Sequence, residues 1–160
     1  MSSTERKSDQ KEKTIEVRKS IVINASPEVV FKAITDPQQL TQWFPDQAIL
    51  EPRVGGKMKF FFQKEKSPKD HTRTSDAFPE GTVKEFIPNK ILSYTWKHMD
   101  IPEFPETLVT WKLEEIDVNK TKVELVHSGF TGREERKSVK EHDQGWSYFL
   151  ERLEKYCREK

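Results

Sequence analysis

Apolar and polar residues alternate along several short stretches of the chain, which is the pattern of a half-buried β-strand. In the first stretch, residues 15–23, the side chains of Ile15, Val17, Ile21 and Ile23 share one phase of the alternation. The same pattern predicts further strands over residues 57–62, 81–87, 91–98, 107–116 and 121–128. Because these segments follow one another at short intervals through tight turns, they predict an antiparallel meander.

Between the first two predicted strands, the pattern changes to that of two short helices. Ser26 is a favourable N-cap and Pro27 suits the first helical position, so a helix is expected to begin here. The apolar residues that follow recur on one side of this helix. Asp36-Pro37 ends it and begins a second short helix that reaches Phe44.

A longer helical pattern occupies residues 133–159. Its apolar stripe is formed by residues at three- and four-residue spacing: Val139, His142, Trp146, Phe149, Leu150, Leu153 and Tyr156. Gly145 interrupts the pattern at a cost of about 1 kcal/mol relative to alanine. A glycine here either permits close approach of another element or marks a kink. The order of elements predicts an α+β fold in which the long helix covers one face of a curved antiparallel sheet.

Two segments are too polar to contribute to a core. Residues 1–13 contain no apolar side chain after Met1, so we expect a disordered tail followed by one domain over residues 14–160. Residues 63–77 contain only Ala77 as an apolar residue and are the second candidate for mobility.

Charge, hydropathy and cysteine content argue against a nucleic-acid-binding, membrane-spanning or secreted protein. The chain has 28 basic and 27 acidic residues with mixed signs, and no basic concentration of the kind that binds nucleic acid. No apolar segment is long enough to predict a membrane span. Cys157 is the single cysteine, so no intrachain disulfide can form, which suits a reducing compartment. The N-terminus shows no apolar segment of a secretory signal, and we expect a cytoplasmic protein.

Several motifs resemble a known family. They are Ala25-Ser-Pro-Glu-Val-Val-Phe, Leu40-Thr-Gln-Trp-Phe, Val54-Gly-Gly-Lys-Met, Leu92-Ser-Tyr-Thr-Trp, Leu125-Val-His-Ser-Gly-Phe and Gln144-Gly-Trp-Ser-Tyr-Phe. Together they resemble the START-like, helix-grip (SRPBCC) superfamily, and within it the homologues of the C-terminal domain of the heat-shock protein 90 ATPase activator. The resemblance implies a curved antiparallel sheet around a long C-terminal helix, with two short helices after the first strand. It also implies a cavity between sheet and helix that can hold small apolar or aromatic ligands.

The candidate ligand-binding residues are mainly aromatic: Trp43, Phe60, Tyr94, Trp96, Trp111, Trp146 and Phe149, together with His127. Aromatic walls suit an apolar pocket for a small molecule. The alternative is that the same rings only fill a dry core. His127 lies in phase with Val123 and Leu125 and is expected to point inward.

An inward histidine has two interpretations. It can hydrogen-bond a ligand or serve as a general base, or it can be a core residue satisfied by a neighbouring hydroxyl or carbonyl group. The same alternatives hold for His142. In contrast, His71 and His98 fall in or beside loops, and we expect them at the surface.

No residue spacing typical of a metal site or a catalytic nucleophile is found. Histidine and cysteine pairs at zinc-binding spacings are absent from the sequence. Cys157 would lie at the C-terminal end of the long helix, where the helix dipole raises the pKa of a thiol. We therefore predict no metal, cofactor or catalytic residue.

Three functions remain open. The first is a binding protein for a small hydrophobic or aromatic ligand. The second is a module that docks on a chaperone or another protein through the outer surface of its sheet. The third is an enzyme of the helix-grip cyclase or hydrolase kind that uses His127.

Overall fold

The computed structural model describes residues 15–69, 72–73, 75–130 and 136–160, with side chains from residue 139 onward in the last range. The predicted disordered tail, His71 and the expected start of the long helix lie outside the described residues. The elements are, in order, β1 (Ile15–Ile23), α2 (Pro27–Thr35), α3 (Pro37–Trp43), β2 (Gln47–Leu50), β3 (Lys57–Phe61), the 3-10 turn η1 (Lys64–Lys66), β4 (Pro79–Ile87), β5 (Ile91–His98), β6 (Thr107–Asp117), β7 (Lys120–Phe130) and α4 (Arg136–Arg158).

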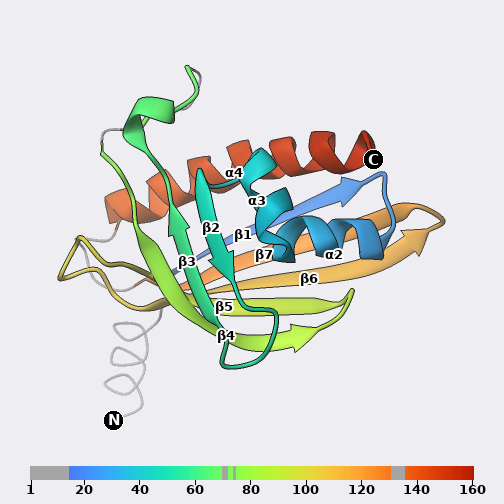
Figure 1. The fold of residues 1–160 in the computed structure, drawn as a ribbon, viewed down its shortest axis with the longest axis horizontal. Helices are drawn as coiled ribbons and strands as arrows, with labels where there is room; N and C mark the ends of the chain where they lie inside the picture. Colours follow the sequence, from blue (N-terminus) through green and yellow to red (C-terminus); the bar gives the residue numbers. More distant parts are fainter. Residues whose placement is uncertain (1–14, 70–71, 74, 131–135) are drawn as a thin grey trace, which may run out of the picture.

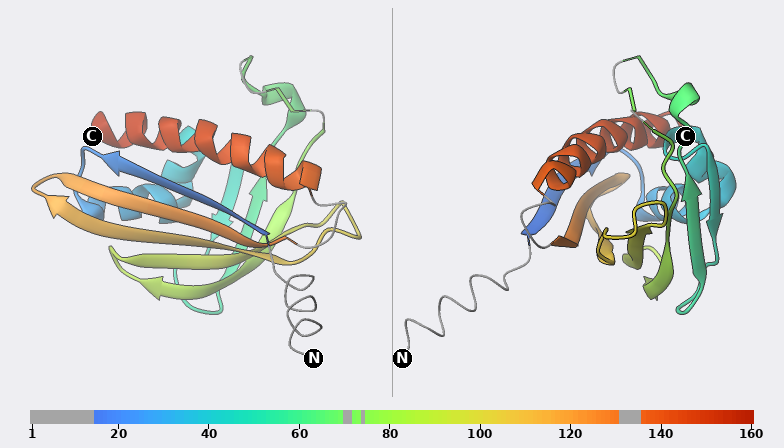
Figure 2. Two further views of the ribbon diagram at one scale, coloured as in Figure 1. Left: turned by 180° about the vertical axis from the view of Figure 1, so that it is seen from behind. Right: turned by 90° about the vertical axis from the view of Figure 1, so that its left-hand side faces the viewer.

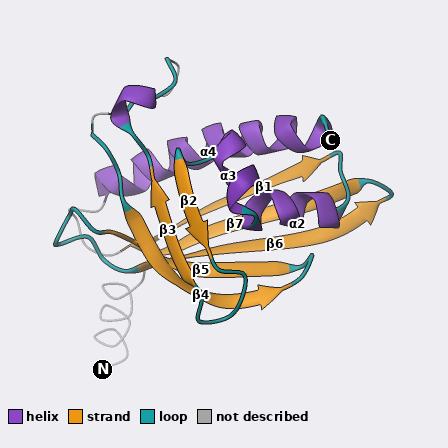
Figure 3. Ribbon diagram, viewed as in Figure 1, coloured by secondary structure: helices purple, strands orange, loops and turns teal. Residues whose placement is uncertain are grey.

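One antiparallel sheet contains all seven strands of the described residues, in the order β1-β7-β6-β5-β4-β3-β2. From β2 to β7 the strands form a meander, and β1 joins the far edge by pairing with β7. The sheet curves around α4, while α2 and α3 pack beside α4 on the same side (Figures 1 and 2). Figure 3 colours the helices and strands differently and shows the helices on one side of the sheet. The predicted helix-grip architecture is confirmed.

Local chemistry explains where the short helices begin. The Ser26 hydroxyl accepts a hydrogen bond from the Val29 amide at 3.3 Å, which satisfies a backbone donor that the first turn of α2 leaves free. The Asp36 carboxylate does the same for α3, accepting from the Gln38 amide at 3.1 Å. Both predicted helices are therefore confirmed, with α3 ending at Trp43.

Strand β2 was not predicted. It has only four residues, and two of them are exposed because β2 is an edge strand that pairs on one side with β3. Four residues are too few for an alternation to stand out from the helix that precedes them. The pairing of Leu50 with Met58 nevertheless brings a buried residue of β2 into the core.

Gly81 marks a close approach between β4 and β5. A Cβ atom at this position would lie 1.8 Å from the backbone oxygen of Thr95 and 2.5 Å from its carbonyl carbon. Because backbone atoms cannot turn aside as a flexible side chain can, we expect Gly81→Ala to lower the free energy of unfolding by about 3 kcal/mol. Urea unfolding measures the change. Lys84→Ala, on the exposed face of the same strand, should change it by less than about 0.5 kcal/mol. Equal stabilities of the two variants would contradict this packing.

The core lies between the concave face of the sheet and the helices. Its largest fully buried side chains include Trp43, Trp111, Tyr94, Phe130 and Leu153. Among the described residues, no helix combines the length and apolar character that crossing a membrane requires.

Candidate functional site

A pocket of about 470 Å³ opens between the N-terminal half of α4, the end of β5, and loop residues 72–73, 75–77 and 100–104. Six aromatic rings line it: Phe44, Phe62, Trp96, Phe104, Trp146 and Phe149. Polar side chains, including Arg73, Asp76, Asp100 and Glu141, complete the lining. Aromatic walls with a few polar groups are typical of small-molecule sites.

The predicted site residues divide into two groups. Trp96, Trp146 and Phe149 line the pocket. The other five are not among its lining residues and lie buried in the core: Trp43, Phe60, Tyr94, Trp111 and His127. These core rings support the pocket walls, since the Trp111 ring contacts that of Trp146 at 5.7 Å between centroids and the Phe60 ring contacts that of Trp96 at 6.0 Å.

The rings of the pocket meet at large angles. Trp96 and Trp146 are 5.8 Å apart between centroids and tilted by 54°. Phe44 and Phe149 are 4.9 Å apart and nearly perpendicular, at 71°. Phe62 is tilted by 50° against Phe149. The lining rings therefore enclose the pocket from several directions, and most neighbours do not stack in parallel.

His127 points inward, as predicted, and both of its ring nitrogens have partners in the protein. Its Nδ1 accepts a hydrogen bond from the Trp146 indole Nε1 at 3.0 Å. Its Nε2 lies 2.7 Å from the Thr107 hydroxyl, which itself donates to the Trp96 carbonyl oxygen at 2.7 Å. Because an indole only donates and the hydroxyl proton is already used, His127 is assigned as the neutral imidazole with its proton on Nε2.

The surroundings of His127 keep it neutral. Burial lowers its pKa well below the usual value, and the nearby rings of His142 and His98 lower it further. The sequence left open whether this residue serves a ligand or the core. Its contacts match those of a core histidine that is satisfied by a hydroxyl group.

His98 is not a surface residue, and that expectation was wrong. It follows Tyr94 and Trp96 in the same phase of β5, so its ring turns inward and becomes half-buried against Phe104 at 4.6 Å between centroids. Its Nε2 lies 3.0 Å from Nε2 of His142. The alternation of Tyr94, Trp96 and His98 predicts an inward ring. We expected a surface residue because His98 is the last residue of the strand, next to a loop.

His98 and His142 form a hydrogen-bonded pair at the pocket wall. The Trp96 indole Nε1 donates to Nε2 of His98 at 3.3 Å, so this nitrogen carries a lone pair and His142 supplies the proton between the two rings. Burial, and then the charge of His142, lower the pKa of His98 to about 3. His98 therefore presents an uncharged imidazole to the pocket at neutral pH.

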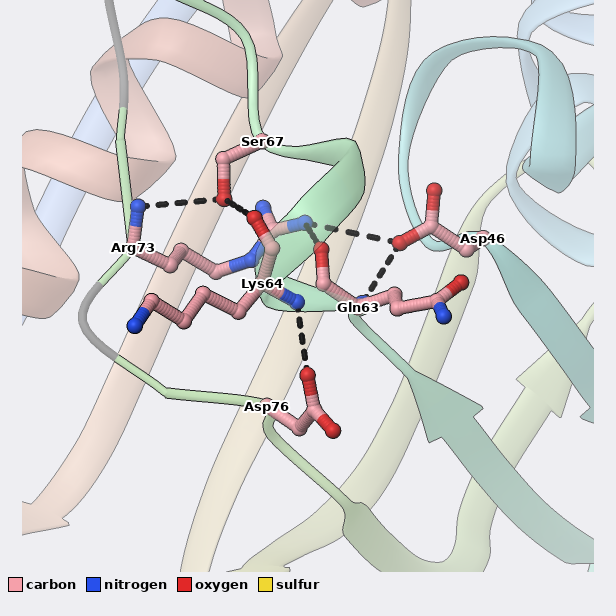
Figure 4. Close-up of polar contacts among 6 residues, drawn as sticks. All are labelled: Asp46, Gln63, Lys64, Ser67, Arg73 and Asp76. Carbon is pink, nitrogen blue, oxygen red and sulfur yellow. Dashed lines mark hydrogen bonds and ion pairs between the residues drawn. The ribbon is translucent and has the colours of Figure 1, made fainter.

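A polar network holds the loop before β4 (Figure 4). The Arg73 guanidinium donates to the Gln63 carbonyl oxygen at 2.8 Å and contacts the Asp46 carboxylate at 3.4 Å. Asp76 accepts a hydrogen bond from the Lys64 amide at 2.7 Å. These contacts fix the polar segment at residues 63–69 against β3 and place Arg73 beside the aromatic ring of Phe62. The mobility predicted for this segment stays a prediction.

The cation of Arg73 is incompletely compensated. Burial lowers its pKa, while Asp46 acts in the opposite direction. Its Nε is buried and has no hydrogen-bond partner among the described residues. The sequence analysis did not select Arg73, because a lone arginine in a polar segment carries no recognisable pattern.

Gly145 lines the pocket from the middle of α4. The absence of a side chain on this surface of the helix leaves volume that would otherwise be filled. Gly145 therefore borders the pocket within one continuous helix, without a kink that divides α4.

Two further kinds of reactive group bear on catalysis, a metal-binding cluster and the cysteine thiol. In the part of the chain that the structure describes, no three histidine, cysteine or acidic residues are arranged to hold a metal ion. Cys157 is buried at the end of α4, and burial followed by the charge of Glu154 raises its pKa to about 12. A thiol with such a pKa stays protonated and is a poor nucleophile.

Comparisons with known proteins agree with the fold. A protein of Mesorhizobium loti has 26% identity and a TM-score of 0.70, over 92% of this chain and 98% of that one. The Aha1 dimer of Colwellia psychrerythraea has 23% identity and a TM-score of 0.72, covering 90% and 96%. An HSP90 activator of Plasmodium falciparum has 24% identity and a TM-score of 0.66, covering 88% and 94%.

The family comparison covers most of the domain. None of the curated proteins compared with the chain matches it. The model of the activator of Hsp90 ATPase homolog 1-like proteins matches residues 24–158, from the end of β1 through the last residue of α4. The chain therefore belongs to the family of activator of Hsp90 ATPase homolog 1-like proteins.

Proposed function

We propose that this protein binds a small hydrophobic or aromatic molecule in the pocket beside α4. The observation that carries the proposal is the gathering of six aromatic rings around one open volume of about 470 Å³. A cavity of this size exceeds what a few water molecules need and lies in the range of small-molecule sites. Trp96, Trp146 and Phe149 would provide most of the apolar contact.

The polar groups would then orient the ligand. His98, His142 and Arg73 line the pocket, whereas His127 lies behind the wall and accepts a hydrogen bond from Trp146. Catalysis by His127 has no comparable support, because the lone pair that a general base needs already accepts the Trp146 proton. The compartment that we propose, in keeping with the single buried cysteine, is the cytoplasm.

Gly145 offers a direct test. Gly145→Leu should fill the pocket and reduce ligand affinity at least about tenfold, while Gly145→Ala adds one methyl group and should retain most of the binding. Both substitutions favour the helix by up to about 1 kcal/mol, so loss of folding should not confuse the result. Binding is measured by NMR. Compact and flat apolar compounds are titrated in turn, and the chemical shifts of the Trp96 and Trp146 indole N–H groups are followed. Shifts that persist unchanged in Gly145→Leu, or a panel that shifts neither resonance, would contradict the proposal.

Docking on a chaperone is a second candidate function. The family match and the likeness to an HSP90 activator favour it. A purified chaperone of the Hsp90 class should then form a complex with this chain, detectable by analytical ultracentrifugation. If that complex forms equally well with Gly145→Leu, the docking surface is separate from the pocket.

A further inference from the structure

The shape of the pocket favours a rounded group over a flat one. A slot for a planar ring needs two parallel walls that stand apart. Phe44 and Trp96 are nearly parallel, at 21°, but stack on each other at 6.4 Å between centroids, whereas Trp146 is tilted by 54° against Trp96 and by 39° against Phe44. Phe149 stands at 71° to Phe44. Aromatic rings that face a common volume from different directions form a cage, and such cages bind alkylated ammonium groups through the negative faces of the rings.

The charges around the cage favour a cation as well. Asp76, Asp100 and Glu141 line the pocket, and none of them forms an ion pair with a cation in the described part of the chain. Arg73 is the one charged basic residue of the lining, and Asp46 already lies beside its guanidinium at 3.4 Å. Asp76 also acts on the charge of Arg73, so three carboxylates share the pocket with one partly compensated cation.

His98 does not oppose a cation at the pocket wall. His98 and His142 share a hydrogen bond between their Nε2 atoms, and His98 also accepts from Trp96. These contacts require lone pairs and fix the uncharged form of His98. A cation in the pocket would lie beside the neutral ring of His98, whereas an anion would face three carboxylates and one partly compensated arginine.

From the tilted rings and the excess of carboxylates, we infer that the ligand of this pocket carries a compact organic cation, such as an alkylated ammonium group. The inference rests on the proposed function, because it names the chemical class of the molecule that the same pocket would hold. The ammonium would lie among Trp96, Trp146 and Phe149, with its charge toward Asp100 and Glu141 at the opening. The rest of the ligand would be apolar.

Three probes of nearly equal shape separate charge from size. Benzyltrimethylammonium is the cation, neopentylbenzene is its neutral counterpart with carbon in place of nitrogen, and 2,2-dimethyl-3-phenylpropanoate is an anion of similar size. We expect the cation to bind about tenfold more tightly than the neutral compound, and the anion to bind most weakly. Titrations follow the indole resonances of Trp96 and Trp146 in the wild-type chain.

Two variants identify the source of the preference. Asp100→Asn combined with Glu141→Gln should weaken binding of the cation about threefold and leave the neutral probe unchanged. Both carboxylates are exposed, so the fold should tolerate the change. The matched control, Glu114→Gln with Glu115→Gln, removes two exposed carboxylates from β6, neither of which lines the pocket. Phe149→Leu keeps an apolar wall but removes a ring, and should reduce the ratio of cation to neutral affinity.

The outcomes separate the two proposals. If the neutral or the anionic probe binds as tightly as the cation, the inference of a cationic ligand is overturned, while the pocket remains a binding site. A preference for the cation that the control variant lowers as much as the pocket variant would also overturn it. If none of the three probes binds, this inference and the proposed function both fail.

Discussion

The free energy of unfolding is expected to fall by about 1.4 kcal/mol per pH unit for each of His98 and His127 as the pH drops below about 6.5. In the folded protein the pKa of His98 is lowered to about 3 and that of His127 also lies well below its usual value, mainly because both rings are buried. In the unfolded chain both rings take up a proton near pH 6.5. Between these values the unfolded state binds more protons, so acid favours unfolding. For His98 the window extends from about pH 6.5 down to about pH 3.

Urea unfolding between pH 7 and pH 5 measures this effect before most carboxylates titrate. His98→Gln is the matched variant, because its amide oxygen can still accept the indole proton of Trp96. Over the interval from pH 6.5 to pH 5, the wild type should lose about 2 kcal/mol more than the variant. Parallel stability curves would show that His98 becomes protonated in the folded state and that its assignment as a neutral ring is wrong.

Trp146→Ala is expected to lower the free energy of unfolding by about 3–5 kcal/mol. The indole is 3% exposed and contacts Phe44, Trp96 and Trp111. Truncation removes these contacts from the junction between α4 and the sheet. Thermal or urea unfolding gives the change, and the variant Lys140→Ala, exposed on the same helix, should stay within about 0.5 kcal/mol of the wild type.

A double-mutant cycle isolates the hydrogen bond between Trp146 and His127. His127→Phe leaves the indole N–H buried without an acceptor, at a cost of about 1–3 kcal/mol. Trp146→Phe removes the donor. The double variant should lose less stability than the sum of the two single changes, because neither polar partner is left unpaired. Strict additivity would contradict the hydrogen bond.

Elements that are long or have a clear capping residue could be predicted from the sequence alone. The alternation from Ile91 to His98 and the caps at Ser26 and Asp36 depend only on nearby residues, and each predicted element is present in the structure. Strand β2 was not predicted, because its four residues derive their conformation from pairing with β3. A partner that lies elsewhere in the chain leaves no periodic signal in so short a segment.

Prediction of the site was less complete for a related reason. Periodicity identifies which side chains turn inward, but it does not separate those that fill the core from those that border an open volume. Trp96 on β5 and Trp111 on β6 both lie at inward-facing positions of their strands and are both buried. Only Trp96 lines the pocket. Arg73 reaches the pocket through contacts with Asp46 and Gln63, which sequence spacing does not reveal.

The pairing of β1 with β7 has a consequence for how the chain folds during synthesis. The Thr121 hydroxyl donates to the Ala25 carbonyl oxygen at 2.7 Å, a contact across 96 positions of sequence. When the chain has emerged from the ribosome as far as β6, strand β7, the neighbour of β1, has not yet been synthesised. The first strand must therefore wait with an unpaired edge until nearly the whole domain has emerged, and such long-range closure folds more slowly than local pairing.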